Sequence, residues 1–241
     1  DIAERMVGDI DFIFSKEDYP KAITVLIEFG YYRKAPSLPT NRHYSRLIKK
    51  DSIAAIEIHK ELLIEKYQNK FNYSFVEKDS QDIKGVTVLS YANKLNLSII
   101  ANQINDHGFY YKTMALRNAY DVFLLSKKTN AKDAVNILDK LSQPLNCFLA
   151  ACCEVFNKVN SLRYNKTKKT ASYLSEFNSQ FTNPIPIKTQ STHIKIYLYI
   201  KSRVNIIYKS IIYKEYRIWL FNLLTDKNWY KRKLVQLGIK K

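Results

Sequence analysis

The sequence lacks the features of an exported, membrane-spanning or zinc-binding protein. Its 241 residues contain no apolar run near the ~20 residues needed to cross a bilayer, and the N-terminus does not read as a signal peptide. The three cysteines, Cys147, Cys152 and Cys153, are odd in number and lack the paired spacing of a zinc site. We therefore expect a cytoplasmic protein, with no structural disulfide or zinc ion, whose cysteines are buried thiols in a helix.

Acidic residues are scarce relative to basic ones. The chain has 39 Lys and Arg against 22 Asp and Glu, a formal charge of +17, and it is rich in Tyr (18) and Phe (12). From Lys188 onward there are 13 basic residues and only two acids, Glu215 and Asp226. A basic surface near aromatic rings suits RNA, because it attracts phosphates. The alternative is a solvated basic face in a chain whose composition reflects an AT-rich genome.

Two carboxylates, Asp9 and Asp11, lie two residues apart in an apolar run (residues 5–14) that reads as a buried strand. Successive strand side chains point to opposite faces, so both acids share one face, and two like charges there repel unless a cation lies between them. Hard oxygen ligands suit a divalent ion such as Mg²⁺. The spacing therefore predicts a metal site.

A third acid, Glu57, lies in a second predicted strand at residues 53–59. Alternation places Glu57 and His59 on one face of that strand. Glu57 could thus complete a triad with Asp9 and Asp11, and a metal held by such a triad favours in-line displacement at phosphorus. The residues indicate nucleotidyl transfer as the reaction class.

The run R-x-x-G-D-I-D-F at residues 5–12, a helix that ends at Gly30-Tyr31, and I-E-I-H at residues 56–59 carry a family resemblance. They resemble the polymerase-beta-like nucleotidyltransferases, most closely a bacterial family described as uncharacterised nucleotidyltransferases. The resemblance covers about the first 75 residues. It extends weakly to His107 and residues 116–121.

The resemblance implies an activity and a set of site residues. It implies transfer of a nucleoside monophosphate from a triphosphate such as ATP to an acceptor hydroxyl, with Mg²⁺ or Mn²⁺ as cofactor. The implied catalytic and metal-binding residues are Asp9, Asp11 and Glu57. The expected nucleotide-binding residues are Arg5, Gly8 and His59.

Some roles stay open at this stage. Arg5 suits phosphate binding or a surface ion pair, and His59 suits a structural hydrogen bond or a place beside the metal or nucleotide. The superfamily's pattern begins with a helix and a glycine-rich turn, whereas this sequence begins at Asp1. We expect either a fragment or an incomplete site.

The acceptor is also open. It could be an RNA end such as that of transfer RNA, a protein side chain as in modifying toxins, or a small hydroxylated molecule; the charge favours RNA. The alternative function is a non-catalytic basic module that retains the fold and binds nucleic acid or a partner protein. A membrane-surface role for the basic C-terminal helices ranks below these, because their apolar positions read as core. Oligomeric state is not indicated.

The pattern of elements predicts an α+β protein. Residues 1–80 form the expected nucleotidyltransferase core, a small mixed twisted sheet with flanking helices, and residues 81–241 form the expected helical domain with basic C-terminal helices. The expected core elements are a helix with a capping box at Ser15 and Asp18 and an apolar stripe from Ala22 to Phe29, which stops at Gly30, then strands at 31–33 and 43–48 and a helix at 60–71. Further helices are expected at 86–105, 109–127, 131–140, 143–160, 193–224 (one or two) and 229–237, with loops at 163–170 and 183–186.

Overall fold

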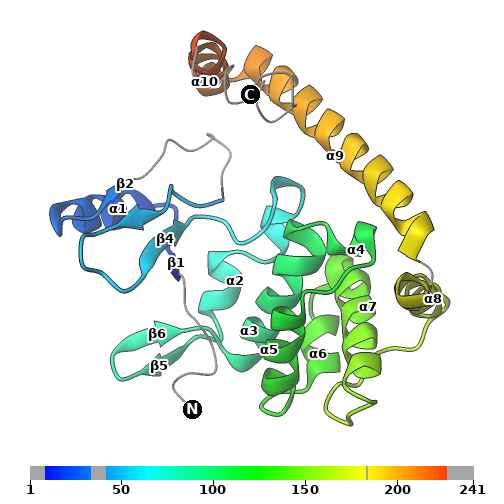
Figure 1. Cartoon of the computed structure of the whole chain (residues 1–241). Coiled ribbons are helices and arrows are strands. Elements are labelled where there is room, and N and C mark those ends of the chain that lie inside the picture. Colours follow the sequence, from blue (N-terminus) through cyan, green and yellow to red (C-terminus); the bar gives the residue numbers. More distant parts are fainter. Residues whose placement is uncertain (1–8, 34–41, 183, 227–241) are drawn as a thin grey trace. The chain divides into compact units, whose positions relative to one another are not determined.

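The computed structural model describes residues 9–33, 42–182 and 184–226 (Figure 1). Arg5, Gly8 and the helix expected at 229–237 lie outside the described residues. The chain divides into two compact units, one of residues 1–36 and 42–189 and one of residues 37–41 and 190–241. The domain boundary expected near residue 80 stays a prediction.

The first unit contains a four-stranded mixed sheet, as the sequence predicts. Its strand order is β1 (Asp9–Ile13), β4 (Ala55–His59), β3 (Leu47–Ile48) and β2 (Tyr32–Arg33). Strands β1 and β4 are parallel, whereas β3 runs antiparallel to both β4 and β2. The parallel pair is the one that carries the predicted acids.

Helix α1 (Tyr19–Glu28) covers one face of this sheet. At its start, Ser15 Oγ accepts a hydrogen bond from the Asp18 backbone N–H and donates one to the Asp18 carboxylate, each at 3.0 Å. The chain leaves the helix at Gly30, whose φ of +84° is easy only for glycine. The apolar side of α1 packs on Ile56 and Ile58, which are buried in β4.

Strand β1 is not buried as expected. The side chains of Ile10 and Phe12 are 45% and 39% exposed. Within the described sheet β1 lies at one edge, and the cluster under α1 is centred on β3 and β4. The apolar alternation of β1 therefore marks its strand character but not its burial.

The helix expected at residues 60–71 is wrong. In its place the chain continues in a non-helical segment that buries Leu62 and Leu63, and a short 3₁₀ helix (Glu65–Lys70) and helix α2 (Tyr73–Glu77) follow. The Leu62 carbonyl accepts hydrogen bonds from the side chains of Arg42 (3.1 Å) and Asn105 (3.0 Å). These side chains thus satisfy a backbone group that a helix would have paired internally.

The helix expected from residue 86 begins later, because a hairpin precedes it. Strands β5 (Gln81–Ile83) and β6 (Val86–Val88) pair antiparallel around Lys84 and Gly85, which both have positive φ. Two left-handed residues suit the tight turns that match strand twist. Helix α3 (Tyr91–Ile100) then starts behind an N-cap at Ser90.

Helices make up the rest of the first unit (Figure 1). After a π-helical turn (Ala101–Asn105) they are α4 (Gly108–Tyr111), α5 (Leu116–Ser126), α6 (Ala131–Asn136), α7 (Asp139–Val155) and α8 (Lys168–Thr182). The breaks expected at Gly108 and at 129–130 are confirmed, but α7 continues through Pro144. Helix α8 is not among the expected elements.

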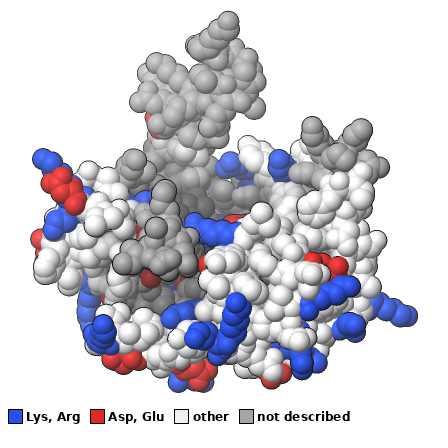
Figure 2. Space-filling view, turned by 60° about the horizontal axis from the view of Figure 1, so that its bottom comes forward, with Lys and Arg blue, Asp and Glu red and all other residues white. Residues whose placement is uncertain are grey.

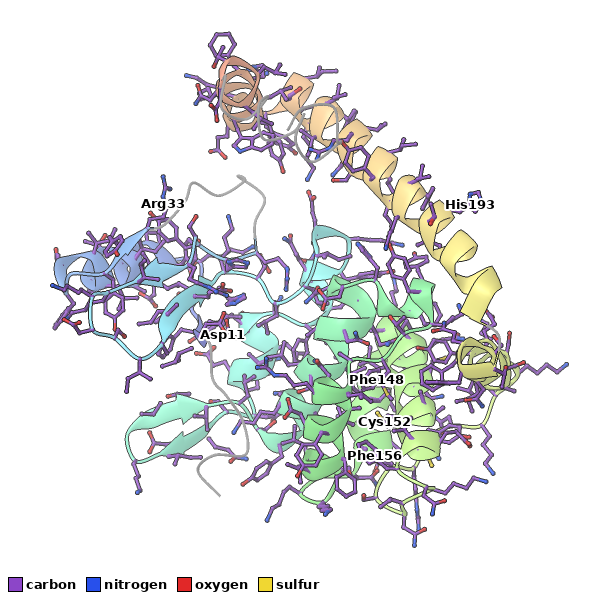
Figure 3. All side chains as sticks on the ribbon, viewed as in Figure 1. Asp11, Arg33, Phe148, Cys152, Phe156 and His193 are labelled. Atoms are coloured by element: carbon purple, nitrogen blue, oxygen red, sulfur yellow. The ribbon has the colours of Figure 1, made fainter. Side chains whose placement is uncertain are left out.

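Helix α7 forms the centre of the helical core. Leu145, Phe148 and Cys152 are each 0% exposed, and Figure 3 shows Phe148 and Cys152 on this helix. Cys147 is likewise buried, as expected, whereas Cys153 is only half-buried. Burial raises the pKa of the Cys147 thiol to about 11.

Among its described residues, the second unit contains most of helix α9 (Pro184–Ile212), which begins at the end of the first unit, and helix α10 (Lys214–Thr225). The connection expected at 183–186 is part of this helix from Pro184 onward, since proline is tolerated in a first turn. Apolar positions expected to be core are exposed instead, for example Tyr199 at 60% and Ile211 at 72%. Among the described residues, no helix combines the length and apolar character needed to span a membrane.

Candidate functional site

The parallel pair β1–β4 brings the three predicted acids to one face of the sheet. The register places Asp9 opposite Ala55 and Asp11 opposite Glu57. Ile56, the neighbour of Glu57, points to the other face and packs under α1. The acids therefore share the face away from α1, as alternation along each strand predicts, and Figure 3 shows Asp11 on this sheet.

An arginine that sequence reasoning missed lies among these acids. Arg46 Nη2 is 2.6 Å from Asp9 Oδ2, and Arg46 Nε is 3.1 Å from Glu57 Oε1. The hydrogen bond to Glu57, followed by the charge of Asp9, raises the pKa of the Arg46 guanidinium. The positive charge expected between the carboxylates is thus supplied, in part, by the protein itself.

His59 contacts the acid on the neighbouring strand. Its Nε2 is 3.0 Å from Asp11 Oδ1 and 3.9 Å from Glu57 Oε2. The hydrogen bond to His59 lowers the pKa of the Asp11 carboxyl and outweighs the opposing effect of burial. His59 therefore favours the ionised form of Asp11.

The other ring nitrogen of His59 shows which role this residue suits. Nδ1 is buried and has no hydrogen-bond partner in the part of the chain that the structure describes. A metal-bound histidine normally donates its second N–H to an acceptor. An orphaned Nδ1 instead suits the tautomer with the hydrogen on Nε2, which donates to Asp11. The geometry favours His59 as the residue that orients Asp11.

Two further basic side chains approach the acids. His43 Nδ1 is 3.7 Å from Glu57 Oε2, and the His43 ring lies 5.0 Å from that of His59. Arg42 is half-buried; burial lowers the pKa of its guanidinium, while Asp106, Glu57 and Asp11 raise it. The acid face thus lies in a cluster of basic groups.

An irregular stretch of backbone explains how His43 and Arg46 both reach Glu57. His43 forms a single antiparallel bridge with His59, and regular β3 begins only at Leu47. Tyr44 and Leu47, three residues apart, both pack into the cluster under α1. Strict alternation cannot place residues three apart on one face, so the pleat is interrupted between them. This interruption lets both basic side chains face the acids.

The site fits a hard divalent cation. One side-chain atom each from Asp11, Glu57 and His59 lies within 4.8 Å of the others, so the two carboxylates are close enough to share one ion while His59 holds Asp11. The Asp11 side chain is 62% exposed, so a nucleotide from solvent could reach it, whereas the Glu57 side chain is only 14% exposed. Carboxylate oxygens are the donors that Mg²⁺ prefers. Asp9 could join them once its carboxylate leaves Arg46.

A comparison with protein families shows which family the chain belongs to. A family described as "Uncharacterised nucleotidyltransferase" matches residues 1–155. The chain belongs to this nucleotidyltransferase family. The resemblance found in the sequence is thereby confirmed, and the match extends well past the first 75 residues, to the end of α7.

The nucleotidyltransferase match includes the sheet and helices α1 to α7, while α8, α9 and α10 follow it. The mixed sheet with flanking helices and a helical C-terminal region is consistent with the expected α+β nucleotidyltransferase fold. The searches of curated proteins and of solved structures found no match.

Proposed function

We propose that this protein transfers a nucleoside monophosphate from a nucleoside triphosphate to an acceptor hydroxyl and releases pyrophosphate. The observation that carries the proposal is the register that sets Asp11 directly opposite Glu57, with Asp9 two residues before Asp11 on the same face. In a chain of this family, three acids so arranged are best explained by metal-dependent chemistry at phosphorus.

We assign Asp9, Asp11 and Glu57 as the residues that hold Mg²⁺, or Mn²⁺ in its place. When bound, the ion neutralises charge that develops on the phosphates. His59 donates its hydrogen bond to Asp11 and keeps that carboxylate ionised and oriented. Glu57 also accepts the proton of the acceptor hydroxyl as its oxygen bonds to the α-phosphorus and the bond to the pyrophosphate oxygen breaks.

Arg46 has two successive partners in this proposal. It pairs with Asp9 and Glu57 in the structure, and its side chain is 51% exposed. If those carboxylates held a cation instead, the Arg46 guanidinium would be available to bind the triphosphate, for which its planar donors are suited. Gly8, immediately before β1 in the sequence, and Arg5, three residues before Gly8, remain proposed nucleotide-binding residues.

The acceptor proposed first is RNA, because the chain carries a charge of +17. On the face shown in Figure 2, Lys and Arg side chains are spread widely, with acidic side chains scattered among them. A protein side chain is the other acceptor to test.

One observation favours a second candidate function. Arg46 already pairs with Asp9 and Glu57, so part of the negative charge on the acid face is balanced without an ion. That arrangement suits a non-catalytic basic module that keeps the fold and binds nucleic acid or a partner protein.

A labelling experiment separates these functions. The protein is incubated with Mg²⁺, each α-³²P-labelled triphosphate and total cellular extract, and label is sought in RNA, protein and small metabolites. Asp11→Asn and Glu57→Gln should abolish transfer. Glu28→Gln, an exposed acid at the end of α1, is the matched control and should leave transfer unchanged. Transfer that survives Asp11→Asn, or no transfer by the unchanged protein, would contradict the proposal.

A further inference from the structure

A second candidate site lies in the helical part of the first unit, away from the acid face. A groove of about 430 Å³ is formed by α4 and the residue that follows it, the first half of α7, and α8. In Figure 1, α3 and α5 lie between the sheet and the helices α7 and α8. The charged and aromatic residues that line the groove are Lys112, Lys140, Lys169, Glu176, Phe109 and Tyr173.

Positive charge in the groove exceeds negative charge. Three ammonium groups face a single carboxylate, that of Glu176, which lies 3.7 Å from Lys112 Nζ. Within residues 9–33, 42–182 and 184–226, neither Lys140 nor Lys169 forms an ion pair. The groove therefore keeps a net charge of about +2, which attracts anions.

Aromatic rings hold one of these lysines in place. Lys112 Nζ lies 5.0 Å from the centre of the Phe109 ring and 5.6 Å from that of Tyr173. The two rings are stacked, with their centres 5.8 Å apart. Attraction between the cation and the ring faces keeps the Lys112 ammonium at the groove, and the Lys112 side chain as a whole is 20% exposed.

Buried and part-buried hydrogen bonds connect the walls of the groove to each other. The Tyr173 hydroxyl donates to Gln103 Oε1 (3.3 Å), and Gln103 Nε2 donates to the backbone carbonyl of Thr113 (3.1 Å). On the same helix as Tyr173, Gln180 Nε2 donates to the carbonyl of Tyr111 (2.9 Å). Helix α8 is thus tied to the segment on both sides of Lys112.

The backbone at Lys112 supports a positioned role for this side chain. Lys112 has a φ of +53°, a left-handed conformation that long side chains rarely adopt. Strained residues of this kind persist where surrounding contacts hold them, and they cluster at functional sites. The contacts to Tyr111 and Thr113 hold Lys112 from both sides.

We propose that this groove binds the phosphodiester backbone of a single-stranded nucleic acid. Lysines from three different segments surround one open groove, and ammonium groups bind phosphates as point charges without needing a fixed geometry. An open groove lets a strand continue past it, which an enclosed pocket would not. The proposal stands apart from the catalytic site, because strand binding requires neither a divalent ion nor a triphosphate.

Fluorescence anisotropy tests this proposal on the full chain without divalent ions. The probes are 20-nucleotide RNA and DNA oligomers of one sequence, titrated at several salt concentrations, together with AMP and inorganic phosphate as competitors. The groove variant is Lys112→Gln, Lys140→Gln and Lys169→Gln. The control variant removes the same charge at three exposed lysines outside the groove: Lys78→Gln, Lys84→Gln and Lys128→Gln.

The groove variant should bind a strand about 100-fold more weakly at 0.1 M salt, and the slope of log K against log salt should become about 2 less steep. Each phosphate contact to a single strand contributes about 0.7 to that slope, and three contacts are removed. The control variant should lose less than about threefold, because its lysines only contribute to the general field. A preference between RNA and DNA identifies the strand type, and either strand supports the proposal.

A second variant protects the test against misfolding at the strained position. Lys140→Gln with Lys169→Gln leaves Lys112 intact and should weaken binding about 25-fold at 0.1 M salt. Equal losses in the groove and control variants, or no strand binding by the unchanged chain, would overturn the proposal. So would a groove variant that loses AMP and phosphate but keeps the strands, since the groove would then take small anions.

Discussion

Replacement of Arg46 by glutamine should strengthen metal binding. In the structure the Arg46 guanidinium forms ion pairs with Asp9 (2.6 Å) and Glu57 (3.1 Å), so an incoming cation has to displace it. Arg46→Gln removes this internal competitor and leaves two carboxylates without a counter-charge. The affinity of the site for Mg²⁺ should therefore rise when Arg46 is replaced.

The size of the effect follows from the exposure of Arg46. Its side chain is 51% exposed, so each ion pair is worth about 0.2–1 kcal/mol. Two such contacts total about 0.4–2 kcal/mol, and the variant should bind Mg²⁺ about 2- to 30-fold more tightly. Triphosphate binding should change in the opposite direction, because the proposed phosphate-binding group is lost.

Isothermal titration calorimetry with Mg²⁺, and separately with ATP in Ca²⁺ to prevent turnover, measures both changes. Arg33→Gln is the matched control: this residue lies on β2 of the same sheet, against the ring of Tyr44, and should affect neither titration. Unchanged or weaker Mg²⁺ binding in Arg46→Gln would show that Arg46 does not compete with the ion for Asp9 and Glu57.

Three further predictions concern single side chains. His59→Ala should raise the pKa of Asp11 toward its usual 3.8, which NMR titration of the carboxyl carbon measures. The lowered pKa of Asp11 stabilises the fold above about pH 4, and this contribution is lost as the pH falls. The free energy of unfolding of the variant should therefore depend less on pH in acid. At pH 8 the Cys147 thiol, with a pKa of about 11, should be ionised in only about one molecule in a thousand. Iodoacetamide followed by mass spectrometry should therefore label half-buried Cys153 first, and fast labelling of Cys147 in the native protein would count against its burial. Ile58→Ala should lower the free energy of unfolding in urea by about 2–5 kcal/mol, against under about 1 kcal/mol for exposed Ile10→Ala; similar losses would mean that β1 and β4 are equally buried.

The sequence predicted the part of the site that depends on regular strands. Alternation along two strands was enough to place Asp9, Asp11 and Glu57 on one face, and the parallel register bears out that placement. The family resemblance depended on the same residues and is confirmed by the match over 1–155. Their role as metal ligands stays a prediction.

Arg46 and His43 could not be found in the same way, because the strand that carries them is interrupted. Alternation through residues 43–48 separates His43 from Arg46, whereas the irregular backbone after His43 brings both to Glu57. The spacing of Tyr44 and Leu47, two apolar residues three apart, was the available signal.

Tertiary contacts explain the other differences. The apolar residues after His59 have the spacing of a helix. The Leu62 carbonyl, however, accepts hydrogen bonds from the side chains of Arg42 and Asn105, which are distant in sequence. The hairpin at 81–88 depends on a positive φ at Lys84, and a lysine in the sequence does not indicate a positive φ. Burial of β1 could not be judged, because strand periodicity carries no information about position in the sheet.

The most direct test of the central claim is anomalous diffraction from crystals grown with Mn²⁺ and a non-hydrolysable triphosphate. We expect an anomalous peak within bonding distance of carboxylate oxygens of Asp11 and Glu57, with Arg46 moved from Asp9 onto the phosphates. A crystal that shows bound nucleotide, no peak at the acids and Arg46 still bridging Asp9 and Glu57 would contradict it.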